Sequence, residues 1–328
     1  MTGNAVRVAV LGLGAMGRPM ARRLARDLPV TVFDPAFDPG SGSAAGFDPA
    51  DVTAGRDVPG ITVAATAAEA ATGADVVLVA VRDSEQVHGA LFGEQGAAAA
   101  MRPGAVVVLT STVGPDAARA TAARLAESDL AFVDAPVSGG PARAGSGDLL
   151  IVVGAGETEL AAARPVLDRL GSTVTVVGPR PGDGQSLKAI NQLLAGVHIA
   201  AAAEAVALAR GVGLDPAVVI DSLSKGAAGS FMLADRGPRM IEAYGAGAQV
   251  RSRLDIFVKD MGIVTGIAKD AHVPLPLAAA AQQLYLLGER AGLGAADDST
   301  VVTLLSPPHE SAQDSAHDSA RNSPAPPD

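Results

Sequence analysis

The chain has 328 residues, of which 48% are hydrophobic, a formal net charge of −10 at pH 7 and no cysteine. This length allows two domains of ordinary size. The negative charge argues against nucleic acid as the main partner, because no basic stripe is available to neutralise phosphates. The absence of cysteine excludes disulfides, thiolate catalysis and cysteine-ligated metal sites.

No targeting or membrane segment is expected. The apolar run from Val6 to Leu13 leads directly into a glycine-rich loop and no basic segment precedes it, so it is predicted to be a strand rather than part of a signal peptide. Later apolar segments are interrupted by glycine or charge before about 18 residues, so no membrane-spanning helix is expected. We therefore expect a cytoplasmic protein.

The first half of the chain alternates short β-branched runs with alanine-rich stretches, which is the pattern of a parallel α/β sheet. Continuous apolar runs such as Val76–Val81 are typical of strands covered on both faces. Residues 35–60 carry many Gly, Pro and Asp and are expected to be irregular. Strands are predicted over Val6–Leu11, Val30–Phe33, Ile61–Ala64, Val76–Val81, Val106–Thr110, Ala131–Asp134, Leu149–Val153 and Thr173–Val177. Helices are predicted over Gly17–Leu28, Ser84–Phe92, Asp116–Glu127 and Glu157–Leu170.

The character of the chain changes after Gly178, where strand patterns stop and long Ala- and Leu-rich segments follow. Helices are predicted over residues 184–211, 216–224, 233–244, 253–271, 277–291 and 298–305. The first of these is apolar on all sides, which predicts that it is buried, either within the chain or against a partner subunit. Residues 306–328 are rich in Pro, Ser and Asp, cannot bury a core and are expected to be disordered. The expected domains are therefore 1–178, 179–305 and a 306–328 tail.

A glycine loop joins the first predicted strand to the first predicted helix. Its residues are Gly12, Leu13, Gly14, Ala15, Met16 and Gly17. The first glycine permits a tight turn, the second lets the backbone approach a pyrophosphate, and the third allows close helix–strand packing. Asp34 ends the second strand, where a carboxylate accepts the ribose hydroxyls of NAD and repels the 2′-phosphate of NADP. This predicts an α/β fold with an N-terminal doubly wound, Rossmann-type sheet that binds NAD, followed by an all-helical C-terminal domain. The alternative is that the glycines serve only helix packing and that Asp34-Pro35 forms only a turn.

A second motif begins where an apolar strand ends at Asp134. It continues to a Ser138-Gly139-Gly140 turn, whose successive N–H groups can converge on a carboxylate. On spacing alone, a plain Pro/Gly turn is the favoured interpretation.

The third motif is Lys188, followed on the same helical face by Asn191 and Gln192. Polar groups on an apolar helix cost free energy unless they have partners. Removal of a lysine from water favours its neutral form, which is the form that accepts a proton. The alternative is a lysine near the helix end that extends to solvent.

Further polar residues give no clear site by themselves. Asp255, Lys259 and Asp260 fall within six residues, a spacing usual for a solvated face, and neither His198 nor His272 has a second ligand at metal spacing. We therefore predict no metal site. No motif of a P-loop, a nucleophile elbow or a zinc protease is present.

Four segments, in the order in which they occur along the chain, resemble the β-hydroxyacid dehydrogenase family. This family includes 3-hydroxyisobutyrate dehydrogenase and tartronate semialdehyde reductase. The segments are residues 12–20, 134–140, 184–192 and 259–260, and the resemblance extends over about residues 5–305. Within the family, residues 192–201 and 255–260 resemble the L-threonate dehydrogenase subgroup. Asn191, however, stands where that subgroup prefers His, which leaves the identity of the hydroxy acid open.

The resemblance implies roles for individual residues. It implies that Lys188 is the catalytic, proton-transferring residue in oxidation of a short hydroxy acid by NAD. The substrate carboxylate and its neighbouring groups would contact Ser138, Gly139, Gly140, Asn191 and Gln192. The cofactor would contact Val81, Thr112 and Lys259 in addition to the glycine loop and Asp34. The resemblance also implies a homodimer or homotetramer.

Two other classes of protein stay open on this sequence. Imine reductases share the architecture but usually carry another proton donor in place of the lysine. Non-catalytic cofactor-binding relatives tend to lack the lysine at this position. The retained Lys188 therefore favours a dehydrogenase.

Overall fold

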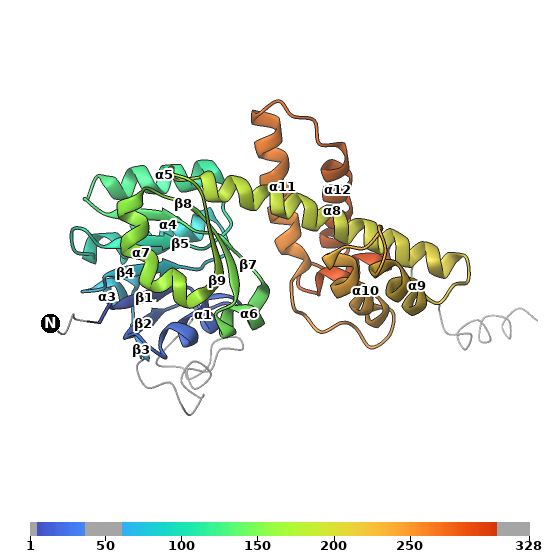
Figure 1. Cartoon of the computed structure of the whole chain (residues 1–328), viewed down its shortest axis with the longest axis horizontal. Helices are drawn as coiled ribbons and strands as arrows, with labels where there is room; N and C mark the ends of the chain where they lie inside the picture. The colour runs from blue at the N-terminus through green and yellow to red at the C-terminus, as the bar shows by residue number, and fades with distance from the viewer. Residues whose placement is uncertain (1–4, 37–60, 307–328) are drawn as a thin grey trace, which may run out of the picture. The chain divides into compact units, whose positions relative to one another are not determined.

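The computed structural model describes residues 5–36 and 61–306. Most of the expected irregular segment, residues 37–60, and nearly all of the expected tail, residues 307–328, lie outside this description. Contacts within the chain divide it into two units, residues 1–192 and 193–328. The two units are described separately below (Figure 1).

The first unit is built on one nine-stranded sheet with the strand order β3-β2-β1-β4-β5-β6-β8-β7, and β9 pairs with β8. Strands β1 to β6 are parallel, as the sequence predicted, whereas β8 runs antiparallel to both β6 and β7, and β9 runs parallel to β8. The strands are β1 (Val8–Leu11), β2 (Val30–Phe33), β3 (Ile61–Val63), β4 (Val76–Val79), β5 (Val106–Leu109), β6 (Ala131–Asp134), β7 (Val137–Ser138), β8 (Leu149–Gly154) and β9 (Gly171–Gly178).

Helices cover both faces of this sheet (Figure 1). Alternate residues of each strand enter opposite cores: Val8 and Val10 pack on one face, and Ala9 and Leu11 on the other. The first core is closed by α1 (Gly17–Leu24), α6 (Gly140–Ser146) and α7 (Glu157–Leu170). The second core is closed by α3 (Ala67–Ala71), α4 (Ser84–Phe92), α5 (Pro115–Ala126) and the 3-10 helix η1 (Ala98–Ala100). This two-sided burial explains why the strands are continuously apolar in sequence.

Four short elements were not predicted from the sequence: α3, α6, β7 and η1. The helix predicted over Gly17–Leu28 ends at Leu24 instead. Pro29 disfavours helical geometry at the residue before it, which is why the helical pattern stops short of Leu28.

The carboxyl ends of the parallel strands meet at one edge of the sheet because the strands are in register. Leu11 lies between Phe33 and Val79, and Leu109 pairs with Asp134. The loops that follow β1, β4, β5 and β6 therefore emerge side by side, which is where ligands bind in folds of this type.

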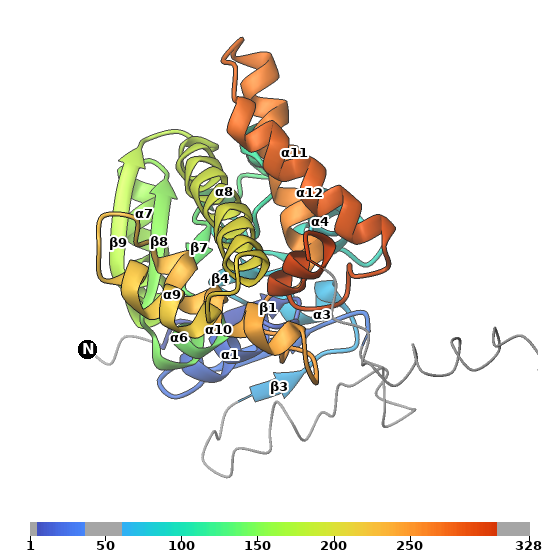
Figure 2. The same ribbon diagram turned by 90° about the vertical axis from the view of Figure 1, so that its right-hand side faces the viewer.

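The second unit is helical, as predicted (Figure 2). Helix α8 (Asp183–Gly211) gives its first residues to unit 1 and its remainder to unit 2. It is followed by α9 (Pro216–Ser224), α10 (Phe231–Ala243), α11 (Leu254–Asp270), α12 (Pro276–Arg290) and the 3-10 helix η2 (Asp298–Leu304). A buried ionic cluster joins α10 to η2. In it, Arg239 donates to Asp297 (2.8 Å) and Asp298 (3.2 Å), and Arg236 also donates to Asp298 (2.9 Å).

Of the helices that the structure describes, α8 alone is long and apolar enough to cross a membrane by length and composition. The sequence prediction counted uninterrupted apolar runs, whereas this criterion admits a glycine and up to two charged residues within an 18-residue window. One such helix is weak evidence for a span, because a buried core helix meets the same criteria, and half of the window is buried. Within unit 2 the Tyr285 hydroxyl donates to the Gly196 carbonyl of α8 (2.7 Å).

Candidate active site

The glycine loop is folded tightly against itself and against the end of β4. Gly12 has φ +93°, and a Cβ there would lie 2.5 Å from the Ala80 carbonyl oxygen. A Cβ on Gly17 would lie 1.9 Å from the carbonyl oxygen of Gly12. Both positions therefore require glycine, for the turn and for close packing respectively, as the sequence predicted.

Gly14 has a different environment from the other two glycines. A Cβ at Gly14 would meet no heavy atom of the described residues within 4 Å. A hollow lined by Gly14, Ala15, Arg18 and Pro19 lies at this point. It adjoins the start of α1, where unsatisfied N–H groups and the helix dipole favour an anion. The loop thus leaves open space beside the one glycine whose backbone a pyrophosphate must approach, so these residues fit a dinucleotide.

Asp34 is fixed beside the start of the same loop. Its Oδ2 accepts a hydrogen bond from the Leu13 amide (2.6 Å), and its Oδ1 accepts one from the Ala36 amide (2.9 Å). A carboxylate has further lone pairs, so the ribose hydroxyls of a dinucleotide can still donate to it. The fold thus brings Asp34 into contact with the glycine loop at Leu13, although 21 residues separate the two in the sequence.

The loops after β4 and β5 are also joined at this edge of the sheet. The Val81 amide donates to Ser111 Oγ (2.9 Å), and Thr112 is the next residue along the chain. The predicted cofactor residues Val81 and Thr112 therefore lie on neighbouring loops that this hydrogen bond connects.

Lys188 and Ser138 come together although 50 residues separate them. Lys188 Nζ donates to Ser138 Oγ at 2.8 Å, and the lysine side chain is buried, with 7% of Lys188 exposed. The alternative of a lysine that extends to solvent is therefore wrong. A buried ammonium is costly unless it has polar partners, and the Ser138 hydroxyl is one such partner.

The segment after Ser138 is a strand-to-helix junction rather than a plain turn. Ser138 pairs with Leu150 in the β7–β8 ladder, and α6 begins at Gly140. Gly139 has φ +137° and Gly140 has φ +73°, conformations that L side chains rarely adopt. The two glycines therefore let the chain reverse immediately beside the serine hydroxyl.

One turn beyond Lys188, two amide side chains bond to each other. Asn191 Nδ2 donates to Gln192 Oε1 (2.8 Å), and Gln192 is 8% exposed. Both belong to the part of α8 that groups with unit 1. Their predicted contact with substrate stays a prediction.

Lys259 lies on α11 in unit 2 and forms an ion pair with Asp260 (2.7 Å). Its predicted contact with the cofactor also stays a prediction.

Sequence reasoning missed Gln185 and the role of Asp134. Asp134 is fully buried, and its carboxylate accepts from Gln185 Nε2 (2.8 Å) and from the amides of Gly182 and Gln185 (both 2.9 Å). Burial raises the pKa of Asp134 to about 6, and these hydrogen bonds limit the rise. Two sequence features could have indicated these residues: an acid at the end of a buried strand and a glutamine in the first turn of an apolar helix.

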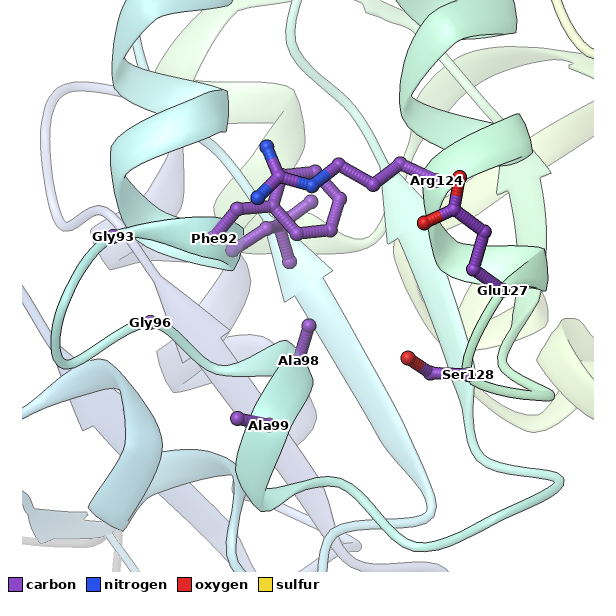
Figure 3. A pocket seen from close by; sticks show the side chains of 9 residues that line it. Phe92, Gly93, Gly96, Ala98, Ala99, Arg124, Glu127 and Ser128 are labelled. Carbon is purple, nitrogen blue, oxygen red and sulfur yellow. The ribbon is translucent and has the colours of Figure 1, made fainter.

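A second hollow lies at the opposite edge of the sheet, where α4 and α5 end (Figure 3). The Arg124 guanidinium lies over the Phe92 ring, 4.1 Å from its centroid, and Glu127 and Ser128 line the same hollow. Its lining shares no residue with the glycine loop and does not include Lys188. Within residues 5–36 and 61–306, no three His, Asp or Glu side chains are grouped to hold a metal ion.

A dinucleotide-binding edge with a buried lysine beside a serine defines a nicotinamide-dependent dehydrogenase of the Rossmann type. Two family models match the chain. The first, described as the NAD binding domain of 6-phosphogluconate dehydrogenase, matches residues 7–178. The second, described as NAD-binding of NADP-dependent 3-hydroxyisobutyrate dehydrogenase, matches residues 182–305. The chain belongs to the 3-hydroxyisobutyrate dehydrogenase family of β-hydroxyacid dehydrogenases, and NAD is its cofactor.

Individual relatives agree with this family. The chain is 40% identical to an L-threonate dehydrogenase from Cupriavidus necator over 91% of this chain and 95% of that protein. Among solved structures, a 3-hydroxyisobutyrate dehydrogenase from Salmonella typhimurium has a TM-score of 0.80 and 36% identity, and covers 91% of this chain and 99% of its own. A Mycobacterium tuberculosis 3-hydroxyisobutyrate dehydrogenase with L-serine has a TM-score of 0.76 and 27% identity, with coverage of 92% and 100%. The protein is thus an NAD-dependent hydroxyacid dehydrogenase.

Proposed function

We propose that this dehydrogenase oxidises L-threonate or a similar short sugar acid, and that Lys188 transfers the hydroxyl proton. The observation that carries the proposal is the 2.8 Å contact between Lys188 Nζ and Ser138 Oγ at the carboxyl edge of the sheet. The 40% identity to an L-threonate dehydrogenase supports this choice of substrate.

NAD, when bound, accepts the hydride from the substrate carbon at its nicotinamide ring. The protein has to position the hydroxyl and manage its proton. In oxidation, neutral Lys188 Nζ takes the proton from the hydroxyl oxygen as the carbon–oxygen double bond forms. In the reverse direction the ammonium returns that proton. The burial of Lys188 and its contact with Ser138 support this role, because they hold Nζ in a defined position beside the proposed carboxylate site.

The substrate carboxylate would be held by Ser138 Oγ and the amides of Gly139 and Gly140. The positive φ angles of both glycines support this assignment, since they allow consecutive N–H groups to converge. Asn191 and Gln192, on the same face of α8 as Lys188, would bond the remaining hydroxyl groups of a sugar acid. Thr112 and Lys259 would contact the nicotinamide end of the cofactor.

The acid itself has two competitors, 3-hydroxyisobutyrate and the tartronate semialdehyde couple. Asn191 keeps them open because the threonate subgroup prefers His at this position. A neutral amide bonds hydroxyl groups as donor and acceptor, whereas 3-hydroxyisobutyrate has one hydroxyl group and a methyl group. The amide pair Asn191–Gln192 therefore favours a polyhydroxy acid.

The organisation of the protein completes the proposal. We propose a domain boundary at residue 178, and the end of one family model at that residue supports it. We also propose a cytoplasmic homodimer or homotetramer that associates through the helical unit. Large apolar side chains exposed on that unit, such as Phe231 (74%) and Leu277 (71%), support such an interface.

The test is Lys188→Ala assayed with NAD and a panel of threonate, erythronate, 3-hydroxyisobutyrate, glycerate and serine. We expect kcat to fall by orders of magnitude while the Kd for NAD changes less than threefold. Lys225→Ala is the matched control, because Lys225 is exposed and its ion pair is with exposed Asp221, four residues earlier in the chain. Retained turnover in folded Lys188→Ala would refute the proton-transfer role, and turnover confined to 3-hydroxyisobutyrate would refute the sugar-acid assignment.

A further inference from the structure

The side chain of Gln185 is completely hydrogen-bonded inside unit 1. Its Oε1 accepts from the amides of Val113 (2.9 Å) and Gly114 (3.1 Å), and its Nε2 donates to the Ser111 carbonyl (3.0 Å) and to Asp134 Oδ1 (2.8 Å). A primary amide has two N–H donors and two lone pairs on its oxygen, so all four are used. Gln185 is 1% exposed, and each of these bonds is therefore shielded from water.

The backbone partners of Gln185 determine which end of its side-chain amide is the oxygen and which is the nitrogen. Two N–H groups point at Oε1, so the amide oxygen must face Val113 and Gly114. Nε2 must then face Asp134, and a carboxylate oxygen is the acceptor that it meets. The other carboxylate oxygen accepts from the amides of Gly182 and Gln185, so both oxygens of Asp134 are held by donors.

Glycines bring α8 into direct contact with the strands at this point. A Cβ on Gly184 would lie 2.9 Å from the Val152 carbonyl oxygen and 3.0 Å from both the carbonyl oxygen and Oδ2 of Asp134. Gly182, with φ +94°, would place a Cβ 2.9 Å from the Pro115 carbonyl oxygen. The first turn of α8 therefore lies directly against β6 and β8, and its contacts there include the polar ones to Asp134.

The lysine of the site lies three residues after Gln185, nearly one turn along the same helix. Gln185 joins that turn to the loop that carries Thr112, and Asp134 joins it to the segment that leads to Ser138. Any rotation of the first turn of α8 would move Lys188 Nζ away from Ser138 Oγ. A displacement of about 1 Å in such a group can cost about 100-fold in rate.

We propose that Gln185 and Asp134 are positioning residues of the reaction, forming a polar clamp that holds α8 at the angle at which Lys188 meets Ser138 and the Thr112 loop. This inference rests on the proposed function, since its catalytic effect is exerted through Lys188. Both residues are at most 1% exposed, so their proposed effect is on the position of α8 and not on substrate directly. The clamp acts by removing rotational freedom from a helix end.

The test is a double-mutant cycle with Gln185→Glu and Asp134→Asn at pH 8. Gln185→Glu sets two carboxylates against each other, and Asp134→Asn sets an amide donor against Gln185 Nε2. In the double variant, the new amide at position 134 again donates to an acceptor at position 185, although the bond to the Ser111 carbonyl is lost. We expect each single change to lower kcat at least 30-fold with the Kd for NAD within threefold. The double variant should recover at least tenfold relative to the product of the single losses.

Hydrogen exchange separates the clamp from the chemistry. The amides of Val113, Gly114 and Gly182 should exchange faster in each single variant, whatever the substrate, and should be protected again in the double variant. Gln283→Glu, on the exposed face of α12, is the control for the same chemical change. Gln185→Asn, one methylene shorter, replaces Gln185→Glu if the latter does not fold.

The outcomes distinguish the clamp from the proposed function. Unchanged exchange, or a double variant that recovers nothing, overturns the clamp. Faster exchange with kcat within threefold of the parent overturns its positioning role. Full turnover in Lys188→Ala would instead overturn the proposed function, and it would leave the exchange result standing.

Discussion

Gly14→Ala and Gly17→Ala should separate cofactor binding from folding, although both glycines belong to one loop. A Cβ added at Gly17 would start 1.9 Å from the Gly12 carbonyl oxygen, whereas a Cβ added at Gly14 would meet no atom of the described residues within 4 Å. Gly14 is also absent from the glycines with positive φ in that part of the chain, so alanine fits its backbone without strain.

The expected magnitudes follow from these distances. Real Cβ contacts below 3.0 Å essentially never occur, so Gly17→Ala forces the loop or α1 to move by about 1 Å. Overpacking of this kind costs about 1–3 kcal/mol, and each kcal/mol lowers Tm by about 2–4 °C in a unit of this size. Gly14→Ala should leave the Tm of the protein without cofactor unchanged or slightly raised. Its methyl group occupies the space that a pyrophosphate needs. Losing one charge-assisted hydrogen bond costs about 1.5–3 kcal/mol, which corresponds to about a 10- to 100-fold rise in Kd for NAD.

The assay combines thermal unfolding without cofactor and calorimetric titration with NAD. Gly89→Ala is the control, because its Cβ also meets no atom within 4 Å among the described residues but lies on α4, outside the loop. A Gly14→Ala protein that binds NAD within threefold of the parent would refute the placement of the pyrophosphate. A Gly14→Ala protein that loses as much Tm as Gly17→Ala would refute the open space beside Gly14.

Three further changes test other parts of the structure. Asp34→Asn retains an acceptor for the Leu13 amide but removes the charge that repels a 2′-phosphate. The ratio of NAD affinity to NADP affinity should therefore fall at least fivefold. An unchanged ratio would refute the role of Asp34 in repelling the 2′-phosphate. Arg239→Ala leaves buried Asp297 and Asp298 with less positive charge, so urea unfolding should show a loss of about 3 kcal/mol, against less than about 1 kcal/mol for exposed Arg290→Ala. Asp134 has a folded pKa of about 6, above its ordinary value of 3.8, so its contribution to stability is complete below about pH 4 and is lost as the pH rises through 6. The stability of the parent relative to Asp134→Asn should therefore fall by about 2 kcal/mol between about pH 4.5 and 7.5, and a difference independent of pH would contradict the raised pKa.

The elements were predictable from sequence wherever one period held over a whole segment. The buried strands have continuous apolar runs because helices cover both faces of the sheet, and the helix over Ser84–Phe92 was bounded correctly because Asp83 caps it through the Gln86 amide. Helices α3 and α6 are five and seven residues long, too short for periodicity to identify. The sheet edge beyond β6 reverses direction through β7, a two-residue strand that no pattern announces.

Some residues of the candidate site could likewise be predicted from the sequence, and others could not. The glycine loop could be predicted because its residues are contiguous and each has a local steric task. Gln185 could not, because its significance lies in partners 51 to 74 residues away that only the fold brings within hydrogen-bonding distance. Glutamine in a helix is ordinary, and only its burial among four polar partners distinguishes it.

The residues assigned to the cofactor and those assigned to the substrate are held in place by different kinds of contact, and this difference affects how substrate specificity could change. The glycine loop proposed to hold the cofactor is fixed by close backbone contacts, and even a methyl group is excluded at Gly12 and Gly17. The residues assigned to the substrate lie on α8 and the 134–140 segment, and their relative position depends on a clamp of side-chain hydrogen bonds. Substitutions at Asn191 or Gln192 leave that clamp intact, because neither is among the partners of Asp134 or Gln185 described above. If the proposed substrate contacts of Asn191 and Gln192 hold, substitutions there should change the preferred hydroxy acid while the Lys188–Ser138 contact is kept.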